Sequence, residues 1–567
     1  MGGKTMDKKR CLFFGALGLS ALLAACAPGD IEGESDSGAS VSLESVASDA
    51  SIIPDDGTNK TVKVKLYKAG WGEEWLKAMI SAFENTYSAE GYKVEIVESS
   101  ATVISTTEQE LLLGPAKNDV DIYFSGQTSI PTVLSRTKKV LKSDATPLLY
   151  SFDNILDEPC IGANKLPEKE TLRSRMFGGY DAYSKYHGEM TQWDGQTFEL
   201  SWANNAVGLF VNPRVLAKYS LDVPLTSDEF IADLKTISAK SASTGVYPYA
   251  WAGNNAPGYW QYLYLSWFGQ ASGVDGFNKW VSLNNDNVAN GYEVYQDQGI
   301  LAALNGMHDT LNLNYSENGA ANMTHLEMQD RFLTDKAAFV VDGDWLLNEM
   351  SQDYLSEAKG VEMMKTPILS SIGTEIGVTD ADLHTIVKGI DDGEDDATIK
   401  GKVSALTDTG LARVRAARHV YASIGIDHQV LVPSYSDALT AASYFLRFMF
   451  SADGCRIFHA NARGTLPFSY EQSAEEIAAD SAFEQSVRKV TENGKGIIVD
   501  ENPSLSVIRS KAAMLSWNNP AWRSAQTWKT VMLNIADSAY SAQAMFDGEA
   551  TYEKNQWSTY LAAAGLA

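Results

Sequence analysis

The alternation of strand and helix patterns at the start of the organised sequence most constrains the fold. Residues 61–67 alternate Val or Leu with Lys, which is the period of two typical of a strand buried on one face. Residues 75–87 then place a large apolar side chain at every fourth position, which predicts an amphipathic helix. Two further strand patterns follow in "GYKVEIVES" and "NDVDIYFSG", with a second helix expected between them. This order predicts an α/β fold with a largely parallel sheet.

Two loops of this region are the first candidates for a site. In open α/β sheets, ligands bind beyond the carboxyl ends of the strands. The loops that follow the first and third predicted strands are residues 69–74 and 125–128. We therefore expect side chains from both loops to lie near a ligand.

A second unit of strands and helices follows. The stretch "FELSWANNAVGLFVNP" contains two strand patterns interrupted by "WANN". Thr226, followed three residues later by Glu229, forms a capping box and predicts the start of a helix. An aromatic-rich stretch, residues 245–269, leads through further helices to "AAFVVDGDW". We interpret this last segment as a buried strand, a tight turn and Trp345 at the start of the next helix.

The N-terminus carries the pattern of an export signal. Basic residues precede an uncharged apolar stretch, residues 12–25, which is shorter than the roughly 20 residues that a membrane-spanning helix needs. Its end, "LAAC", resembles the lipobox of bacterial lipoproteins, which implies cleavage before Cys26 and attachment of a diacylglyceryl group to its thiol. We therefore expect a signal peptide over 1–25 and a lipid anchor at Cys26. The alternative is an ordinary secretory signal with an incidental cysteine.

Composition and length indicate how the rest of the chain is organised. Residues 26–60 are rich in Ser, Gly, Asp and Glu, so they bury too little apolar surface to fold and are expected to form a flexible tether. The 542 residues left after cleavage (567 − 25) exceed one ordinary domain and predict two large lobes. The formal net charge of −26 argues against nucleic acid and anionic lipid as partners.

The sequence offers no recognisable catalytic or cofactor motif. It lacks P-loop, GxGxxG, HExxH, CxxC and GxSxG patterns, and its seven histidines have no ligand spacing. We therefore expect no enzyme activity, no cofactor and no metal site, and we interpret His325 and His428 as loop or surface residues. The acidic run "GIDDGEDDATIKG" does not match an EF-hand and is interpreted as a solvated loop. Cys160 and Cys455 are expected to be unpaired thiols, with a disulfide between them as the alternative, since their spacing in the sequence gives no geometry.

Four segments together resemble family 1 extracellular solute-binding proteins, the carbohydrate-binding subunits of ABC importers similar to maltose-binding protein. They are "WDGQTFELSWANNAVGLFVNPRVL", "PLTSDEFIADLKTI", "FLTDKAAFVVDGDW" and "AASYFLRFMFSADG". The resemblance covers about residues 60–560. Asp335 departs from it, since Gly is common there, but Asp tolerates the same left-handed backbone. The chain is also longer than most members, with extra length near 140–190 and 370–425.

The resemblance implies a type II periplasmic-binding-protein-like fold. In that fold two discontinuous α/β lobes are joined by crossover strands at a hinge, and the cleft between them closes over a ligand. We assign residues 60–200 and 352–450 to the first lobe. Residues 201–351 and 451–567 are assigned to the second lobe.

The same resemblance, with the physics of sugar recognition, suggests the site residues. Flat aromatic rings cover the C–H faces of a sugar, while Asn, Asp or Glu groups bind its hydroxyls. Trp75 and Trp267 fall in helical apolar stripes and are interpreted as core residues. The expected ligand contacts are Trp71, Glu73, Ser125, Gly126, Trp202, Asn204, Asn205, Trp251, Tyr259, Trp260, Trp345 and Trp517.

The function that the resemblance implies is capture of a mono- or oligosaccharide for delivery to ABC permease subunits. The protein would be anchored by its lipid to the outer face of the bacterial cytoplasmic membrane. Three alternatives stay open: a binding protein of the same fold for a peptide, polyamine or anion, a surface glycoside hydrolase, and a carbohydrate-binding surface lipoprotein without transport. Carboxylates are abundant, so a glycosidase pair is compatible with the sequence.

Overall fold

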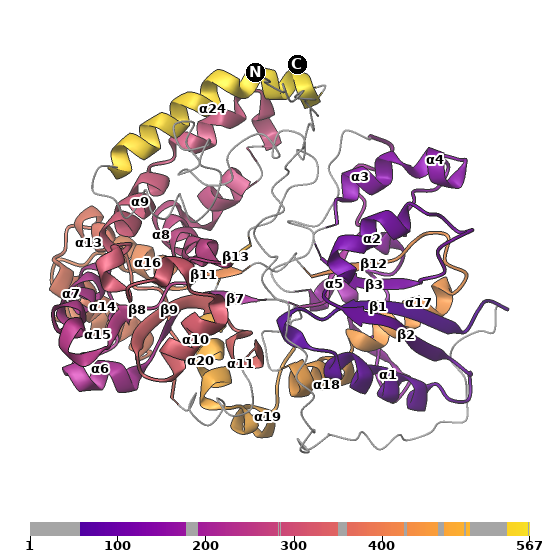
Figure 1. Ribbon diagram of the computed structural model, residues 1–567, viewed down its shortest axis with the longest axis horizontal. Helices are drawn as coiled ribbons and strands as arrows, with labels where there is room; N and C mark the ends of the chain where they lie inside the picture. Colours follow the sequence, from indigo (N-terminus) through magenta and orange to yellow (C-terminus); the bar gives the residue numbers. More distant parts are fainter. Residues whose placement is uncertain are drawn as a thin grey trace, which may run out of the picture.

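The computed structural model describes residues 57–126, 128–176, 191–203, 205–281, 283, 285–349, 360–423, 428–462, 470–492, 495–498, 541–564 and 566. The expected signal peptide, Cys26, Asn204, Trp517 and the tether up to residue 56 lie outside the described residues. Figure 1 shows two lobes side by side, each built around its own sheet. Within the described ranges, no helix is long and apolar enough to cross a membrane.

The first lobe is built on a five-stranded sheet in the order β2-β1-β3-β12-β6. β1 is parallel to both β2 and β3, as the alternation of strands and helices predicts. β12 runs antiparallel between β3 and β6, so a late segment of the chain completes an early sheet. The strands span Thr61–Tyr67 (β1), Lys93–Ser100 (β2), Ile122–Ser125 (β3), Leu200–Ser201 (β6) and Gln429–Leu431 (β12).

Helices cover both faces of this sheet because side chains alternate along its strands. Ile122 and Phe124 join one core with α1, α17 and α18, whereas Tyr123 between them joins a smaller core with α2 and α3. Trp75 of α1 is fully buried in the larger core, which confirms its interpretation as a core residue. The helices span Glu74–Thr86 (α1), Val103–Leu111 (α2), Ile130–Ser135 (α3), Leu439–Met449 (α17) and Ala452–Ala462 (α18).

A small two-stranded ribbon, β4 and β5, extends the first lobe in the region expected to hold extra length. β4 spans Pro159–Ile161 and pairs antiparallel with β5, Pro167–Thr171. The short helix α5, Leu172–Arg175, follows β5 and begins with a capping box. Cys160 of β4 and Cys455 of α18 are both buried, free cysteines.

The second lobe is built on a six-stranded sheet in the order β13-β11-β7-β9-β8, with β10 also paired to β7. Every residue of β7 and β9 is buried, as expected for central strands covered on both faces. Asp335, just before β9, has a φ of +61°, the left-handed conformation expected there. The strands span Ala206–Val211 (β7), Tyr247–Tyr249 (β8), Ala337–Gly343 (β9), Glu362–Met363 (β10), Val420–Ser423 (β11) and Lys495–Ile498 (β13).

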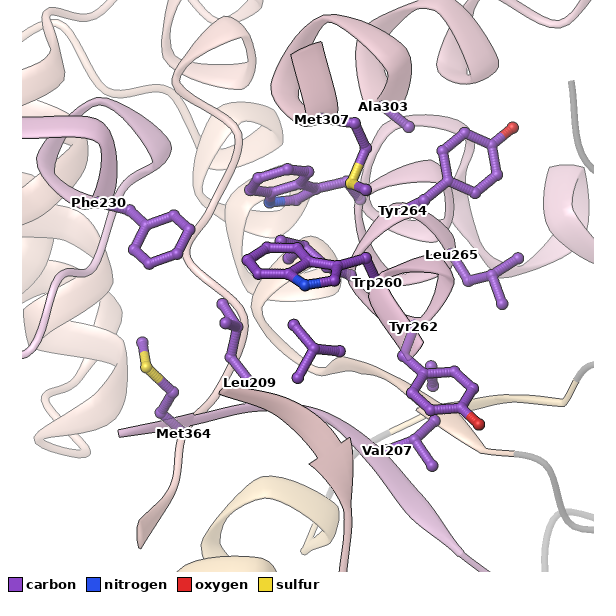
Figure 2. Close-up of a cluster of buried hydrophobic side chains, with 14 of the residues drawn as sticks. Val207, Leu209, Phe230, Trp260, Tyr262, Tyr264, Leu265, Ala303, Met307 and Met364 are labelled. Carbon is purple, nitrogen blue, oxygen red and sulfur yellow. The ribbon is translucent and has the colours of Figure 1, made fainter. Parts of the chain in front are cut away.

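Helices with large apolar side chains fill the space around this second sheet. Figure 2 shows Trp260, Tyr264 and Met307 grouped above Leu209 of β7. Trp267 is also fully buried here, as its place in an apolar stripe predicts. α7 begins with the predicted capping box of Thr226 and Glu229. The main helices span Ser227–Thr244 (α7), Gln261–Val281 (α8), Gln298–Thr310 (α9), His325–Leu333 (α10), Leu346–Glu349 (α11), Ala482–Thr491 (α20) and Ala542–Ala564 (α24).

The chain crosses between the two sheets at identifiable segments. β6 ends at Ser201 in the first sheet, and β7 begins at Ala206 in the second. β11 ends at Ser423 in the second sheet, and β12 begins at Gln429 in the first. These two short crossings, residues 202–205 and 424–428, therefore connect the lobes directly.

The division of the chain between the cores differs from the expected boundaries. Residues 361–422 were expected in the first lobe, but their buried apolar side chains join the core of the second. Residues 451–462 were expected in the second lobe, but α18 packs against α1 in the first. The reason is the apolar stripes of α14 (Asp380–Asp391) and α16 (Asp408–Arg418), whose Ile386 and Val414 are fully buried in the second core.

The acidic run "GIDDGEDDATIKG" is not a solvated loop, because most of it belongs to two helices. α14 spans Asp380–Asp391 and α15 spans Asp396–Lys402. Asp395 caps α15 by accepting a hydrogen bond from the Thr398 backbone N–H at 2.8 Å. Asp391 at the end of α14 pairs with the buried Arg418 at 2.6 Å. Acidic residues of this run therefore cap one helix and form an ion pair at the end of another. The density of charge alone does not indicate these roles.

Candidate ligand-binding site

The candidate site lies where the first sheet meets the two crossings. Gln429 of β12 is in register with Ser125 at the carboxyl end of β3 and with Ser201 at the end of β6. The two crossings therefore leave the first sheet at the edge where β3 ends. In the second sheet, Ala206 is in register with Ser423, so both crossings also enter at one edge.

Ser125, Gly126 and Trp202 lie together at this edge, within the first lobe. Trp202 is 0% exposed and stacks on Trp75 with ring centroids 5.2 Å apart. Its indole N–H donates a hydrogen bond to the Ser125 carbonyl at 3.1 Å, and the Ser125 hydroxyl lies 2.7 Å from that of Thr107. Gly126 is also buried. The structure thus brings these predicted residues together, but protein groups cover the Trp202 ring in this conformation.

Trp71 and Glu73 follow β1, where the sequence predicts them. Trp71, in the short helix η1 (Ala69–Trp71), is 4% exposed. The Glu73 carboxylate lies 2.7 Å from the Lys77 ammonium and 3.2 Å from that of Lys68. Burial alone would raise the pKa of Glu73, but the Lys77 and Lys68 ammonium groups lower it to about 2. Glu73 is therefore charged and already held by lysines.

His428 is the residue that the sequence interpretation missed. It was expected in a loop or on the surface, but its side chain is buried between Tyr67, Trp71 and Trp202, with ring centroids at 6.3, 6.5 and 4.8 Å. Burial lowers the pKa of His428 to about 3, so the ring is neutral. The predicted residue Asn205 is fully buried beside it, with the amide nitrogen 3.3 Å from the imidazole Nδ1.

His325, expected in a loop or on the surface, is instead buried in a helix. It is the first residue of α10, and its Nδ1 lies 2.8 Å from the amide nitrogen of Asn255. The Asn255 amide oxygen in turn accepts the His325 backbone N–H at 2.9 Å. Because this pairing lies within the second lobe, it has no part in the candidate site.

Trp345 joins the second lobe to this edge of the first. It lies two residues after the end of β9 and is 6% exposed, with its ring 6.3 Å from that of Tyr259 at 72°. A Cβ added to Gly70 would lie 3.0 Å from the Trp345 Cβ, and one added to Gly343 would lie 2.2 Å from its ring. A side chain at Gly343 would therefore collide with the Trp345 ring, and one at Gly70, the neighbour of Trp71, would press against Trp345.

Trp251 and Trp260, two other predicted contacts, are buried in the second core. Trp260 packs on Tyr249, with ring centroids 4.7 Å apart, and belongs to the cluster in Figure 2. Trp251 follows β8 and belongs to the same core. The predicted aromatic residues that the structure describes are all buried in the lobe cores: Trp71 and Trp202 in the first, and Trp251, Tyr259, Trp260 and Trp345 in the second. Trp71 and Trp202 also contact His428, and Trp345 lies against Gly70 of the first lobe.

Glu199 and Asp342 are buried carboxyl residues that the sequence analysis did not single out. Glu199 accepts a hydrogen bond from the Gln429 amide, and burial raises the pKa of Glu199 to about 7. Asp342 of β9 accepts a hydrogen bond from the Gln329 amide at 3.0 Å, and burial together with the nearby Glu349 raises its pKa well above the usual range. Among the described residues, no group of His, Cys, Asp and Glu is arranged to hold a metal ion.

The sequence and the fold were compared with those of known proteins. No protein-family model matches the sequence, and no curated protein matches it. Solved structures do match. A probable secreted solute-binding lipoprotein from Streptomyces coelicolor superposes with a TM-score of 0.55 at 12% identity, covering 88% of this chain and 100% of its own.

Two further solved structures match over nearly the same range. A protein from work on xylan utilisation by the thermophilic bacterium Caldanaerobius polysaccharolyticus gives a TM-score of 0.52 at 16% identity, over 87% of this chain and 99% of its own. The GacH receptor of Streptomyces glaucescens, solved unliganded and with acarbose, gives 0.50 at 14% identity, over 87% and 97%. The expected two-lobed solute-binding-protein fold is thereby confirmed.

Proposed function

We propose that this chain is the substrate-binding lipoprotein of an ABC importer and captures a mono- or oligosaccharide between its lobes. The observation that carries the proposal is the junction: Trp345 of the second lobe lies against Gly70, next to Trp71 and the neutral His428. A sugar presents apolar C–H faces and a rim of hydroxyls. Aromatic rings with a few uncharged polar groups match both. We propose Trp345, Trp71 and Asn205 as contacts.

The fold and the charges support a sugar over an anion. Structures that share the fold include a chitin oligosaccharide binding protein and a receptor solved with acarbose. An anionic ligand needs a cation that is available to it. Lys68 and Lys77, the lysines beside the first loop, are both engaged by Glu73. A neutral ligand therefore fits this junction better.

Binding without catalysis is the second part of the proposal. A glycosidase needs two carboxyls that flank one bond, about 5 to 10 Å apart. Glu199, just before β6 of the first lobe, and Asp342, in β9 of the second lobe, both have raised pKa values, and each is buried against a glutamine amide. A surface glycoside hydrolase is thus the weaker alternative, and recovery of an intact oligosaccharide after incubation tests it directly.

Calorimetry tests the function most directly. The chain from residue 27 onward, with a tag in place of the lipid, is titrated against a panel of mono- and oligosaccharides, amino acids, polyamines and phosphate. We expect saturable binding of at least one saccharide and none of the charged solutes. Binding only of a charged solute, or release of shorter sugars during the titration, would contradict the proposal.

The lipid anchor and the permease partners belong to the same proposal. Cys26 ends the apolar run, so we expect the diacylglyceryl group on its thiol and the protein on the outer face of the cytoplasmic membrane. Cells that make Cys26→Ala are labelled with a radioactive fatty acid, alongside the unchanged chain. We expect label only on the unchanged chain; a labelled variant cut before residue 26 means that the anchor assignment is wrong.

A further inference from the structure

One nitrogen at the junction has no hydrogen-bond partner. Nε2 of His428 is buried and makes no hydrogen bond to any other residue that the structure describes. The whole side chain is 7% exposed. Leaving a buried polar group unpaired costs free energy, so such an atom needs an explanation. Either a water molecule or a ligand atom forms the missing hydrogen bond with Nε2.

The contacts of the ring identify which kind of group is missing. The Asn205 amide nitrogen lies 3.3 Å from Nδ1 and can only donate, so Nδ1 is the acceptor. In a neutral imidazole the other nitrogen then carries the proton. The unpaired atom is therefore an N–H donor, and it lacks an oxygen acceptor.

The neighbours of His428 indicate what kind of oxygen this is. Tyr67 stacks on the ring at 22°, and Trp71 and Trp202 meet it edge-on. None of these side chains, nor Asn205, carries a charge. His428 directly precedes β12, at the edge of the first sheet that faces the second lobe. An uncharged acceptor in a largely aromatic setting between two lobes has the chemistry of a sugar hydroxyl or ring oxygen.

We propose that the Nε2–H of His428 donates a hydrogen bond to an oxygen of the bound saccharide, and that Asn205 fixes the required tautomer. The inference rests on the proposed function and adds a specificity-determining residue to it. Parting of the lobes would open the ring to the ligand, because His428 lies beside Asn205, where the chain passes from the first sheet to the second. Trp71 would lie beside the same sugar, since its ring meets that of His428.

Nuclear magnetic resonance of the histidine rings tests the tautomer and the contact without any substitution. The chain from residue 27 is labelled with ¹⁵N-histidine, and long-range ¹H–¹⁵N spectra are recorded with and without the saccharide found by calorimetry. We expect the His428 ring to show the Nε2–H form and its Nε2 resonance to move on binding. The ring of His325, buried in the second lobe, is the internal control and should not move.

A substitution measures the size of the effect. His428→Phe keeps an aromatic ring in the cluster and removes the donor, so we expect about 10-fold weaker saccharide binding. The control His325→Phe removes a histidine that pairs with Asn255 in the second lobe and should keep the affinity of the folded protein. If His428→Phe does not fold, the spectra of the unchanged chain decide.

The outcomes separate this inference from the proposed function. If a saccharide binds but the Nε2 resonance does not move, or if His428→Phe binds it as tightly as the unchanged chain, only the inference is overturned. In that case a water molecule forms the hydrogen bond with Nε2. An Nδ1–H tautomer overturns the inference as well. If no saccharide binds to the folded protein, the proposed function falls and this inference falls with it.

Discussion

Trp345 is the side chain whose replacement best separates binding from packing. It touches Gly70 of the other lobe, so it lies where a ligand between the lobes would meet it. We expect Trp345→Ala to weaken saccharide binding about 30-fold, which corresponds to about 2 kcal/mol of stacking and burial. The measurement is the dissociation constant, taken with the melting temperature of the same preparation.

A buried tryptophan away from the junction provides the control. Trp267 is fully buried, and its indole N–H donates to the Pro367 carbonyl at 3.0 Å. Trp267→Ala should lower the free energy of unfolding by about 3 to 5 kcal/mol and leave the affinity of the folded fraction unchanged. If Trp345→Ala behaves in the same way, Trp345 is a packing residue and not a ligand contact.

Asp233 makes stability depend on pH in an unusual direction. Burial raises the pKa of Asp233 to about 7, with Glu229 and Asp222 adding to the effect. In the unfolded chain this carboxyl ionises near pH 4, whereas in the folded protein it keeps its proton up to about pH 7. The free energy of unfolding therefore falls as pH rises from about 4 to about 7. Asp233→Asn should therefore melt higher than the unchanged protein at pH 8, with a difference that shrinks towards pH 4.

Asp335 is the matched control because its pKa shifts the other way. Although burial opposes them, hydrogen bonds from Lys218, Asn212 and Arg214 lower the pKa of Asp335. Asp335→Asn should therefore destabilise the protein at pH 7, and the loss should disappear as pH falls below the usual carboxyl range. Equal pH profiles for the Asp233 and Asp335 variants would refute both assignments.

At the scale of elements, a buried ion pair ties the β4–β5 ribbon to the turn that follows α1. Lys165, in the turn of the ribbon, places its ammonium 3.0 and 3.1 Å from the two oxygens of Glu90, and both side chains are buried. Lys165→Met leaves the Glu90 carboxylate unpaired and should cost about 3 to 5 kcal/mol in denaturant unfolding. The double variant with Glu90→Gln should recover most of that loss; no recovery would mean that Lys165 acts through other contacts.

Elements defined by local patterns could be predicted, whereas those defined by distant partners could not. The apolar spacing of α1, the capping box at Thr226 and the left-handed Asp335 depend on a few neighbouring residues, and all three are as expected. The membership of residues 361–422 in the second core depends on β11 pairing with β7. That pairing joins segments about 200 residues apart, so no local pattern encodes it.

The candidate site shows the same limit. Trp345 could be placed from the strand and turn before it, and Trp71 from the strand it follows. The environment of His428 is made by Tyr67, Trp71 and Trp202, which reach it from two separate parts of the chain. A lone histidine before a short strand carries no signal of such surroundings. Its role could be inferred only after the fold had brought those segments together.

For the whole molecule, we expect the ligand to draw the lobes together. Two crossings of a few residues connect the sheets directly, which suits a hinge. Small-angle scattering of the chain from residue 27 should give a smaller radius of gyration with the bound saccharide than without it. A saccharide from the panel that does not bind is the control. A binding saccharide that leaves the curve unchanged would contradict closure.

The position of β12 between β3 and β6 has a consequence for the newborn chain. β3 ends at Ser125, and its neighbour in the sheet begins at Gln429, 304 residues later (429 − 125). At roughly 5 to 20 residues per second, synthesis leaves the β3 edge open for about 15 to 60 s. All four residues of β3 are buried in the finished fold, so this open edge is apolar and prone to pair with other chains. Correct assembly thus depends on keeping the first half of the chain apart from its neighbours until the last quarter is made.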